Sequence, residues 1–197
     1  NFSAATVNNN EVTGNDNTAS ASSTGLSSDA SADGNTVAGD NNSLSSSAIG
    51  ANSLAQVDGN ELNGNNNTGT TLALGDTSEA TINNNDVTGN DNSVGVTSSG
   101  LSSDASADDN SVGGDDNALT ALAAGIESDA HIDANEVDGN GNTLVVAAMG
   151  DTSQALANAN EITGNDNTLN SSATALSADA SANNNDVTGN ANSLFVS

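Results

Sequence analysis

The chain has 197 residues with 26 Asp and Glu and no Lys or Arg, a formal net charge of −26. This charge excludes the basic surface of a nucleic-acid-binding protein and disfavours anionic membranes, and the lack of cysteine excludes disulfides. Only 34 % of residues are hydrophobic, and most of these are Ala, Leu or Val, so large side chains are too few for a conventional core. Such a composition is typical of disorder unless the sequence carries a regular repeat.

A repeat of 25 residues runs through the chain without insertion or deletion. We number its positions from an invariant asparagine at position 0. Full repeats cover 10–34, 35–59, 60–84, 85–109, 110–134, 135–159 and 160–184, with partial repeats at 1–9 and 185–197. Repeats of this kind are typical of solenoids, so we expect one β-solenoid domain over residues 1–197.

The first restricted group of the repeat covers positions 0, 2 and 4. Position 2 is always Val, Leu or Ile. A step of two is the strand period, which places alternate side chains on one face and predicts a short strand around residues 10–14. Position 0 holds Asn10, Asn35, Asn60, Asn85, Asn110, Asn135, Asn160 and Asn185. Position 4 holds Gly14, Gly39, Gly64, Gly89, Gly114, Gly139, Gly164 and Gly189, where glycine permits close packing or a positive φ at a bend.

The second group runs from position 7 to position 15, again in steps of two. The step of three before it predicts a corner, and Gly14-Asn15-Asp16-Asn17 has suitable turn residues. Position 9 is mostly Leu or Val, positions 11 and 13 are mostly small, and position 15 is Gly except at Ala175. A second strand is therefore expected around 17–25. Position 7 holds Asn17, Asn42, Asn67, Asn92, Asn117, Asn142, Asn167 and Asn192.

The third group covers positions 18, 20 and 22, which are mostly Ser, always Ala, and Ala, Val or Ile, respectively. It predicts a third strand around 28–32, and the variable polar positions are expected to face outward. The fold predicted is all-β: a β-solenoid (β-helix) of eight 25-residue coils, with about three short strands per coil and amyloid-like axial stacking. The pattern leaves open a triangular or a flattened two-layer cross-section.

Stacked coils place each residue about 4.8 Å from the same position in the next coil. The asparagines at positions 0 and 7 are therefore expected to form amide ladders, each side chain bonding to its copies above and below. Such ladders are satisfied only when the register is held, so they would also specify it.

The two ends predict self-assembly. Asn1 falls at position 16 and Ser197 at position 12, three residues short of eight repeats, so the two partial coils of neighbouring subunits would nearly complete one coil. Unpaired strand edges are templates for another chain, and a head-to-tail contact gives an open filament. We expect a homopolymeric fibre with a rise of about 38 Å per subunit. The alternative is a fragment of a repetitive β-solenoid adhesin stalk, which would stay monomeric.

The motif Gly-x-x-Asn, from Gly14–Asn17 to Gly189–Asn192, resembles part of the Gln-x-Gly-x-x-Asn-x-Ala core of curli-type secreted functional amyloids. The resemblance covers the whole chain, but Val12 and its equivalents replace the family's first Gln, and its second Gln is replaced by Ser23 and its equivalents. The resemblance implies an extracellular or cell-surface location, secretion through an outer-membrane pore, a nucleator of assembly and a biofilm-matrix role.

No residue pattern indicates catalysis, and we expect no enzyme: His131 is the single histidine and falls at a variable outward position. No cofactor is expected except Ca²⁺, because stacked carboxylates repel one another and a bridging cation or protonation would favour the stack. The calcium candidates are Asp91, Asp115, Asp116, Glu136, Glu161 and Asp186. A less favoured alternative is ice binding, for which position 8 offers one column of Thr and Ser, broken by Ala118.

Overall fold

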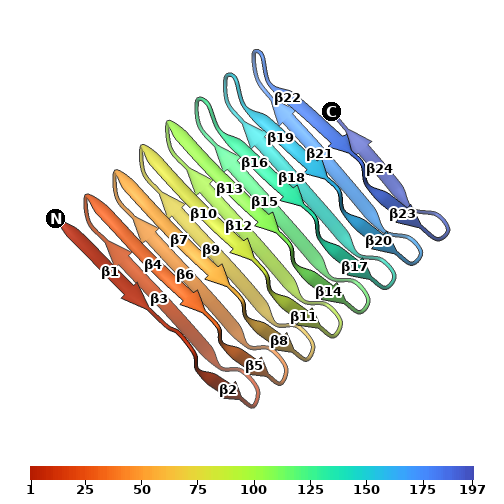
Figure 1. Ribbon diagram of the computed structural model, residues 1–197, viewed down its shortest axis with the longest axis horizontal. Coiled ribbons are helices and arrows are strands. Elements are labelled where there is room, and N and C mark those ends of the chain that lie inside the picture. The colour runs from red at the N-terminus through yellow and green to blue at the C-terminus, as the bar shows by residue number, and fades with distance from the viewer.

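The computed structural model describes residues 1–197 and is all-β, as predicted (Figure 1). Its strands form three parallel sheets of eight strands each, and each coil adds one strand to every sheet. The structure has no helix long and apolar enough to cross a membrane. The prediction of a β-solenoid with three strands per coil is confirmed.

The sheets are named A, B and C. Sheet A contains β1 (Phe2–Thr6), β4 (Ser27–Asp33), β7 (Asn52–Asp58), β10 (Thr77–Asn83), β13 (Ser102–Asp108), β16 (Asp129–Asp133), β19 (Gln154–Asn158) and β22 (Asp179–Asn183). Sheet B contains β2 (Glu11–Thr13), β5 (Thr36–Ala38), β8 (Glu61–Asn63), β11 (Asp86–Thr88), β14 (Ser111–Gly113), β17 (Glu136–Asp138), β20 (Glu161–Thr163) and β23 (Asp186–Thr188). Sheet C contains β3 (Thr18–Thr24), β6 (Ser43–Ile49), β9 (Thr68–Leu74), β12 (Ser93–Ser99), β15 (Ala118–Ala124), β18 (Thr143–Met149), β21 (Thr168–Thr174) and β24 (Ser193–Val196).

Neighbouring strands pair in register at a spacing of one repeat, so that Ala30 lies beside Ala55 and Val87 beside Val112. The backbone makes 138 hydrogen bonds, of which 52 have at least one partner outside a strand. Every one of those 52 also joins neighbouring coils, as when Gly14 N–H donates to Ala38 O at 3.0 Å. The turns are therefore stacked as continuously as the strands, and the backbone satisfies itself along the axis.

The coils are long and narrow, which selects the flattened two-layer form (Figure 1). Sheets A and C are the two broad layers, the three-residue strands of sheet B lie near one narrow edge, and the turns between sheets C and A form the other. A single core of 31 buried hydrophobic residues runs along the stack, with Leu44, Ile82 and Leu119 among its largest members. Small side chains suffice because the two layers lie close together.

The turn from sheet C to sheet A takes two forms. In its first four copies the sheet A strand begins at position 17, but β16, β19 and β22 begin two residues later. There, position 17 has a left-handed backbone, with φ of 57° at Glu127 and 59° at Thr152. In two of these three copies the following serine bonds back to the turn, as when the Ser153 hydroxyl donates to Gly150 O at 2.7 Å.

Candidate functional site: the coil-stacking interface

The first Asn column, at position 0, links each coil to both neighbours through its side chains. Asn60 Oδ1 accepts from Asn35 N–H at 2.8 Å and from Asn35 Nδ2 at 3.0 Å, while Asn35 Nδ2 also donates to Val7 O at 2.8 Å. Amide-to-amide bonds of 2.9–3.1 Å continue from Asn10 to Asn185. The interior members are buried. This column is the predicted amide ladder, with backbone bonds added to it.

The second Asn column, at position 7, is built differently, and the expectation of amide-to-amide bonds here is wrong. Each Oδ1 accepts only from the backbone N–H of the preceding asparagine, at 2.7–2.9 Å. In the later coils Nδ2 turns to the corner instead, as when Asn142 Nδ2 donates to Gly114 O at 3.0 Å. Four Nδ2 groups are buried without a partner, those of Asn42, Asn67, Asn92 and Asn117. The column therefore ties side chain to backbone rather than side chain to side chain.

The glycine column at position 4 lets the coils approach closely. A Cβ placed on Gly39 would clash with Gly14 O, and Gly39 has φ +120°. Both the contact and the bend therefore require glycine. This corner lies between the two Asn columns in the sequence, and a side chain here would push apart the coils that their hydrogen bonds join.

An exposed third column at position 5 was not predicted. Asn140 Oδ1 accepts from Asn165 N–H at 2.9 Å and from Asn165 Nδ2 at 3.0 Å, and Asp115 Oδ1 serves Asn140 in the same way. The sequence did carry the signal, because position 5 is Asn or Asp in every copy: Asn15, Asp40, Asn65, Asn90, Asp115, Asn140, Asn165 and Asn190.

The calcium candidates do not converge on one site. Glu136, Glu161 and Asp186 lie in register on neighbouring strands of sheet B. Asp91 and Asp116 occupy left-handed turn positions in adjacent coils, with φ of 58° at both, beside Asp115 of the position 5 column. The structure contains no group of three or more His, Cys, Asp or Glu side chains arranged to hold a metal ion. Calcium binding therefore stays a prediction.

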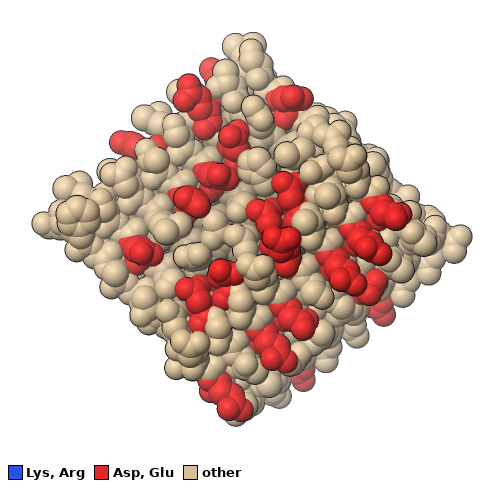
Figure 2. All heavy atoms as spheres, in the orientation of Figure 1, with Lys and Arg blue, Asp and Glu red and all other residues tan.

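Acidic side chains are unevenly distributed over the surface (Figure 2). Of the 26 acidic residues, nine lie in the strands of sheet A, seven in sheet B, ten in turns and none in sheet C. No Lys or Arg balances them. Sheet A and the Asn-bearing edge are therefore strongly negative, whereas the outer face of sheet C is uncharged.

The acidic face of sheet A includes four carboxyl groups that are harder to ionise than usual. Burial raises the pKa of Asp104; the carboxylates of Glu79 and Asp129 add to this rise, whereas His131 opposes it. His131 lies on β16 in register with Ser106 and Leu156. Burial also raises the pKa of three other carboxyls on this sheet: Asp33, Asp108 and Asp133.

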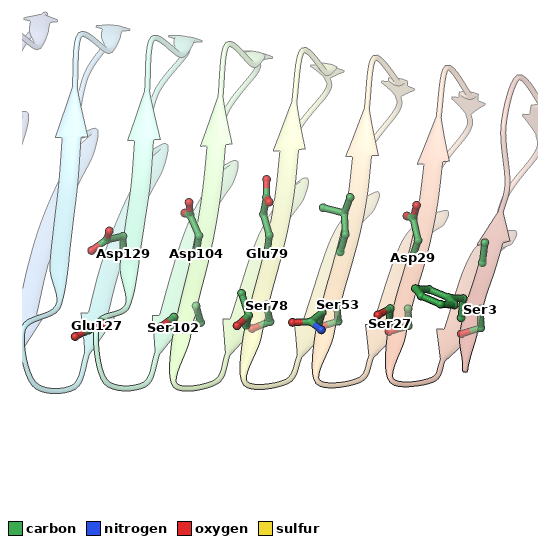
Figure 3. Close-up of a pocket in the computed structure, with 17 residues that line it drawn as sticks. Ser3, Ser27, Asp29, Ser53, Ser78, Glu79, Ser102, Asp104, Glu127 and Asp129 are labelled. Carbon is green, nitrogen blue, oxygen red and sulfur yellow. The ribbon is translucent and has the colours of Figure 1, made fainter.

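A shallow groove of about 780 Å³ follows the stack along the outer face of sheet A (Figure 3). Positions 17–19 of successive coils line it, with carboxylates such as Asp29, Glu79 and Asp104 along its length. Only three of its 17 lining residues are hydrophobic. The groove is a regular surface of the stack, made from the same positions in each coil.

No family description, no curated protein and no solved structure matches this chain. Its functional assignment therefore depends on the interface between coils.

Proposed function

We propose that the chain is a structural subunit that polymerises head to tail into a fibre. One observation supports this above the others: the same coil-on-coil interface recurs at every step of the stack, with in-register strands and Asn columns. The upper face of one coil therefore presents, over the strands and the Asn columns, the same bonding pattern that the lower face of the next coil accepts. A contact that relates subunits by translation is heterologous and does not close, so it yields an open filament.

The fibre proposed is amyloid-like, because its strands lie across the axis and stacked amides hold the register. Following the resemblance to curli-type proteins, we place it outside the cell in a biofilm matrix, with a nucleator and an outer-membrane secretion pore as partners. The neutral amide columns support this assignment, since they give cohesion along the axis to a chain whose net charge of −26 opposes association.

Electron microscopy and fibre diffraction of the purified 197-residue chain test the proposal. We expect unbranched filaments with a meridional spacing of about 4.8 Å and an axial repeat of about 38 Å. Discrete rods at high concentration would refute self-assembly and leave the adhesin stalk as the better description.

A matched pair of variants tests the joint itself. Residues at position 19 donate their N–H to the preceding coil, as Gln154 does to Ser128 O at 3.0 Å and Asp179 does to Ser153 O at 2.9 Å. Ala4 holds this position on β1, the first strand of sheet A, so Ala4→Pro removes a donor that points out of the stack. We expect Ala4→Pro to slow filament growth at least tenfold in a seeded turbidity assay, and Ala4→Val, which keeps the donor, to grow normally.

A further inference from the structure

The outer face of sheet C is uncharged over its whole extent. Its strands contain none of the 26 acidic residues, although they make up one of the two broad layers of the coil. The outward side chains are mainly Ser, Thr and Ala, with Leu72, Leu122, Val145 and Met149 among them. We call these outward side chains the uncharged face.

Two leucines flank the centre of this face. Thr97 on β12 lies in register between Leu72 on β9 and Leu122 on β15. All three are half-buried within the single chain. The strands pair in parallel without a bulge across this region, so the three side chains form one straight row.

From this arrangement we propose that the uncharged face binds the uncharged face of a second copy of the chain, giving laterally paired solenoids. The area is sufficient: eight strands about 4.8 Å apart, each up to seven residues of about 3.3 Å, cover roughly 850 Å². A stable protein interface buries about 800 Å² on each partner. Small side chains also let two such sheets approach closely, as dry interfaces between paired sheets require.

Charge selects a second copy as the occupant. With no Lys or Arg, two copies that meet through sheet A or through the Asn-bearing edge bring carboxylates together without any counter-charge. Of the two broad faces, only the uncharged face lets two chains of net charge −26 approach side by side, and it keeps their acidic faces on the outside of the pair. The spacing between strands is the same on the two faces, because each face is sheet C of its own chain.

A charge placed at the centre of the face should abolish pairing. Thr97→Glu would put two carboxylates into the interface beside Leu72 and Leu122, because each copy carries one. Gln56→Glu is the matched control: it adds the same side chain to a half-buried outward position on sheet A. Like charges buried together cost several kcal/mol, so we expect the dimer Kd to rise about a hundredfold for Thr97→Glu and less than threefold for Gln56→Glu.

The experiment is sedimentation equilibrium on the full chain carrying Ala4→Pro, which separates lateral pairing from growth at the coil ends. Two results together support the proposal: the Ala4→Pro chain forms dimers whose affinity rises with added salt, and these dimers dissociate when Thr97→Glu is added. Rods that stay monomeric at all concentrations and salts overturn it, and so does an equal effect of the two substitutions. If the Ala4→Pro chain still forms filaments, their width tests lateral pairing. We then expect paired filaments when Gln56→Glu is added and single filaments when Thr97→Glu is added.

This proposal and the fibre proposal can fail separately. Filaments of single width would overturn lateral pairing and leave the axial fibre intact. Dimeric rods that never elongate would overturn the axial fibre and leave lateral pairing intact.

Discussion

The two Asn columns hold the same residue in every coil, yet they bond in different ways. In the first column, Asn110 donates to Asn135 Oδ1 and to Ile82 O, and it accepts from both nitrogens of Asn85. In the second column, Asn117 accepts one backbone N–H, from Asn92, and its own Nδ2 is buried without a partner. The asparagines at positions 0 and 7 are both invariant within the repeat, but they contribute unequally to stability. A buried amide stabilises the fold only through the hydrogen bonds that it makes.

The largest effect is expected at the first column. Asn110→Ala would leave Asn85 N–H and Ile82 O without this partner inside the core, and Asn85 Nδ2 would lose one of its three acceptors. Each buried orphaned group costs about 1–3 kcal/mol, so we expect a loss of roughly 3–5 kcal/mol in the free energy of unfolding. Urea denaturation followed by circular dichroism would measure it, and a loss below about 1 kcal/mol would show that the ladder does not stabilise the stack.

A smaller effect is expected from the same substitution in the second column. Asn117→Ala orphans only Asn92 N–H, and it also removes an Nδ2 that has no partner. The expected loss is about 1–2 kcal/mol. Measured beside Asn110→Ala under identical conditions, an equal or larger loss at Asn117 would contradict the ranking of the two columns.

The comparison sharpens further at position 23, where carboxylates replace amides. Asp108 Oδ1 accepts from Asp133 N–H at 3.0 Å, and Asn83 Oδ1 serves Asp108 N–H in the same way at 3.1 Å. Burial raises the pKa of both Asp108 and Asp133 above the unfolded value of 3.8. The folded chain therefore holds more protons than the unfolded chain, and its stability falls as pH rises from about 4 through the raised pKa values.

We accordingly expect a modestly higher melting temperature at pH 4 than at pH 7. The double variant Asp108→Asn/Asp133→Asn keeps an acceptor at each position, so it should melt higher at pH 7 and respond less to pH. Thermal melts of the two proteins across this range measure the effect. A parent chain that melts lower at pH 4 would mean that these carboxyl groups do not control the response.

The sequence predicted the coil better than it predicted the side-chain bonds. The steps of two and three along the repeat place Val37, Ala55 and Leu119 inward, because strand alternation depends on chain geometry alone, and all three are buried. The flattened section did not follow, since it depends on how closely sheets A and C approach. The different bonding of Asn110 and Asn117 did not follow either, because hydrogen-bond partners depend on corner geometry. The uncharged face could have been read from sequence, as no repeat has an acidic residue at positions 8–14.

The Asn columns also give the stack a direction. In the buried first column every amide-to-amide bond is donated toward the C-terminal coil, as from Asn35 to Asn60, whereas in the exposed position 5 column the donation runs the other way, as from Asn165 to Asn140. A subunit arriving upside down would bring carbonyl oxygen to carbonyl oxygen at one column and amide to amide at the other. A fibre built on this stack would thus have two chemically unlike ends, and elongation would be vectorial, with a fast and a slow end.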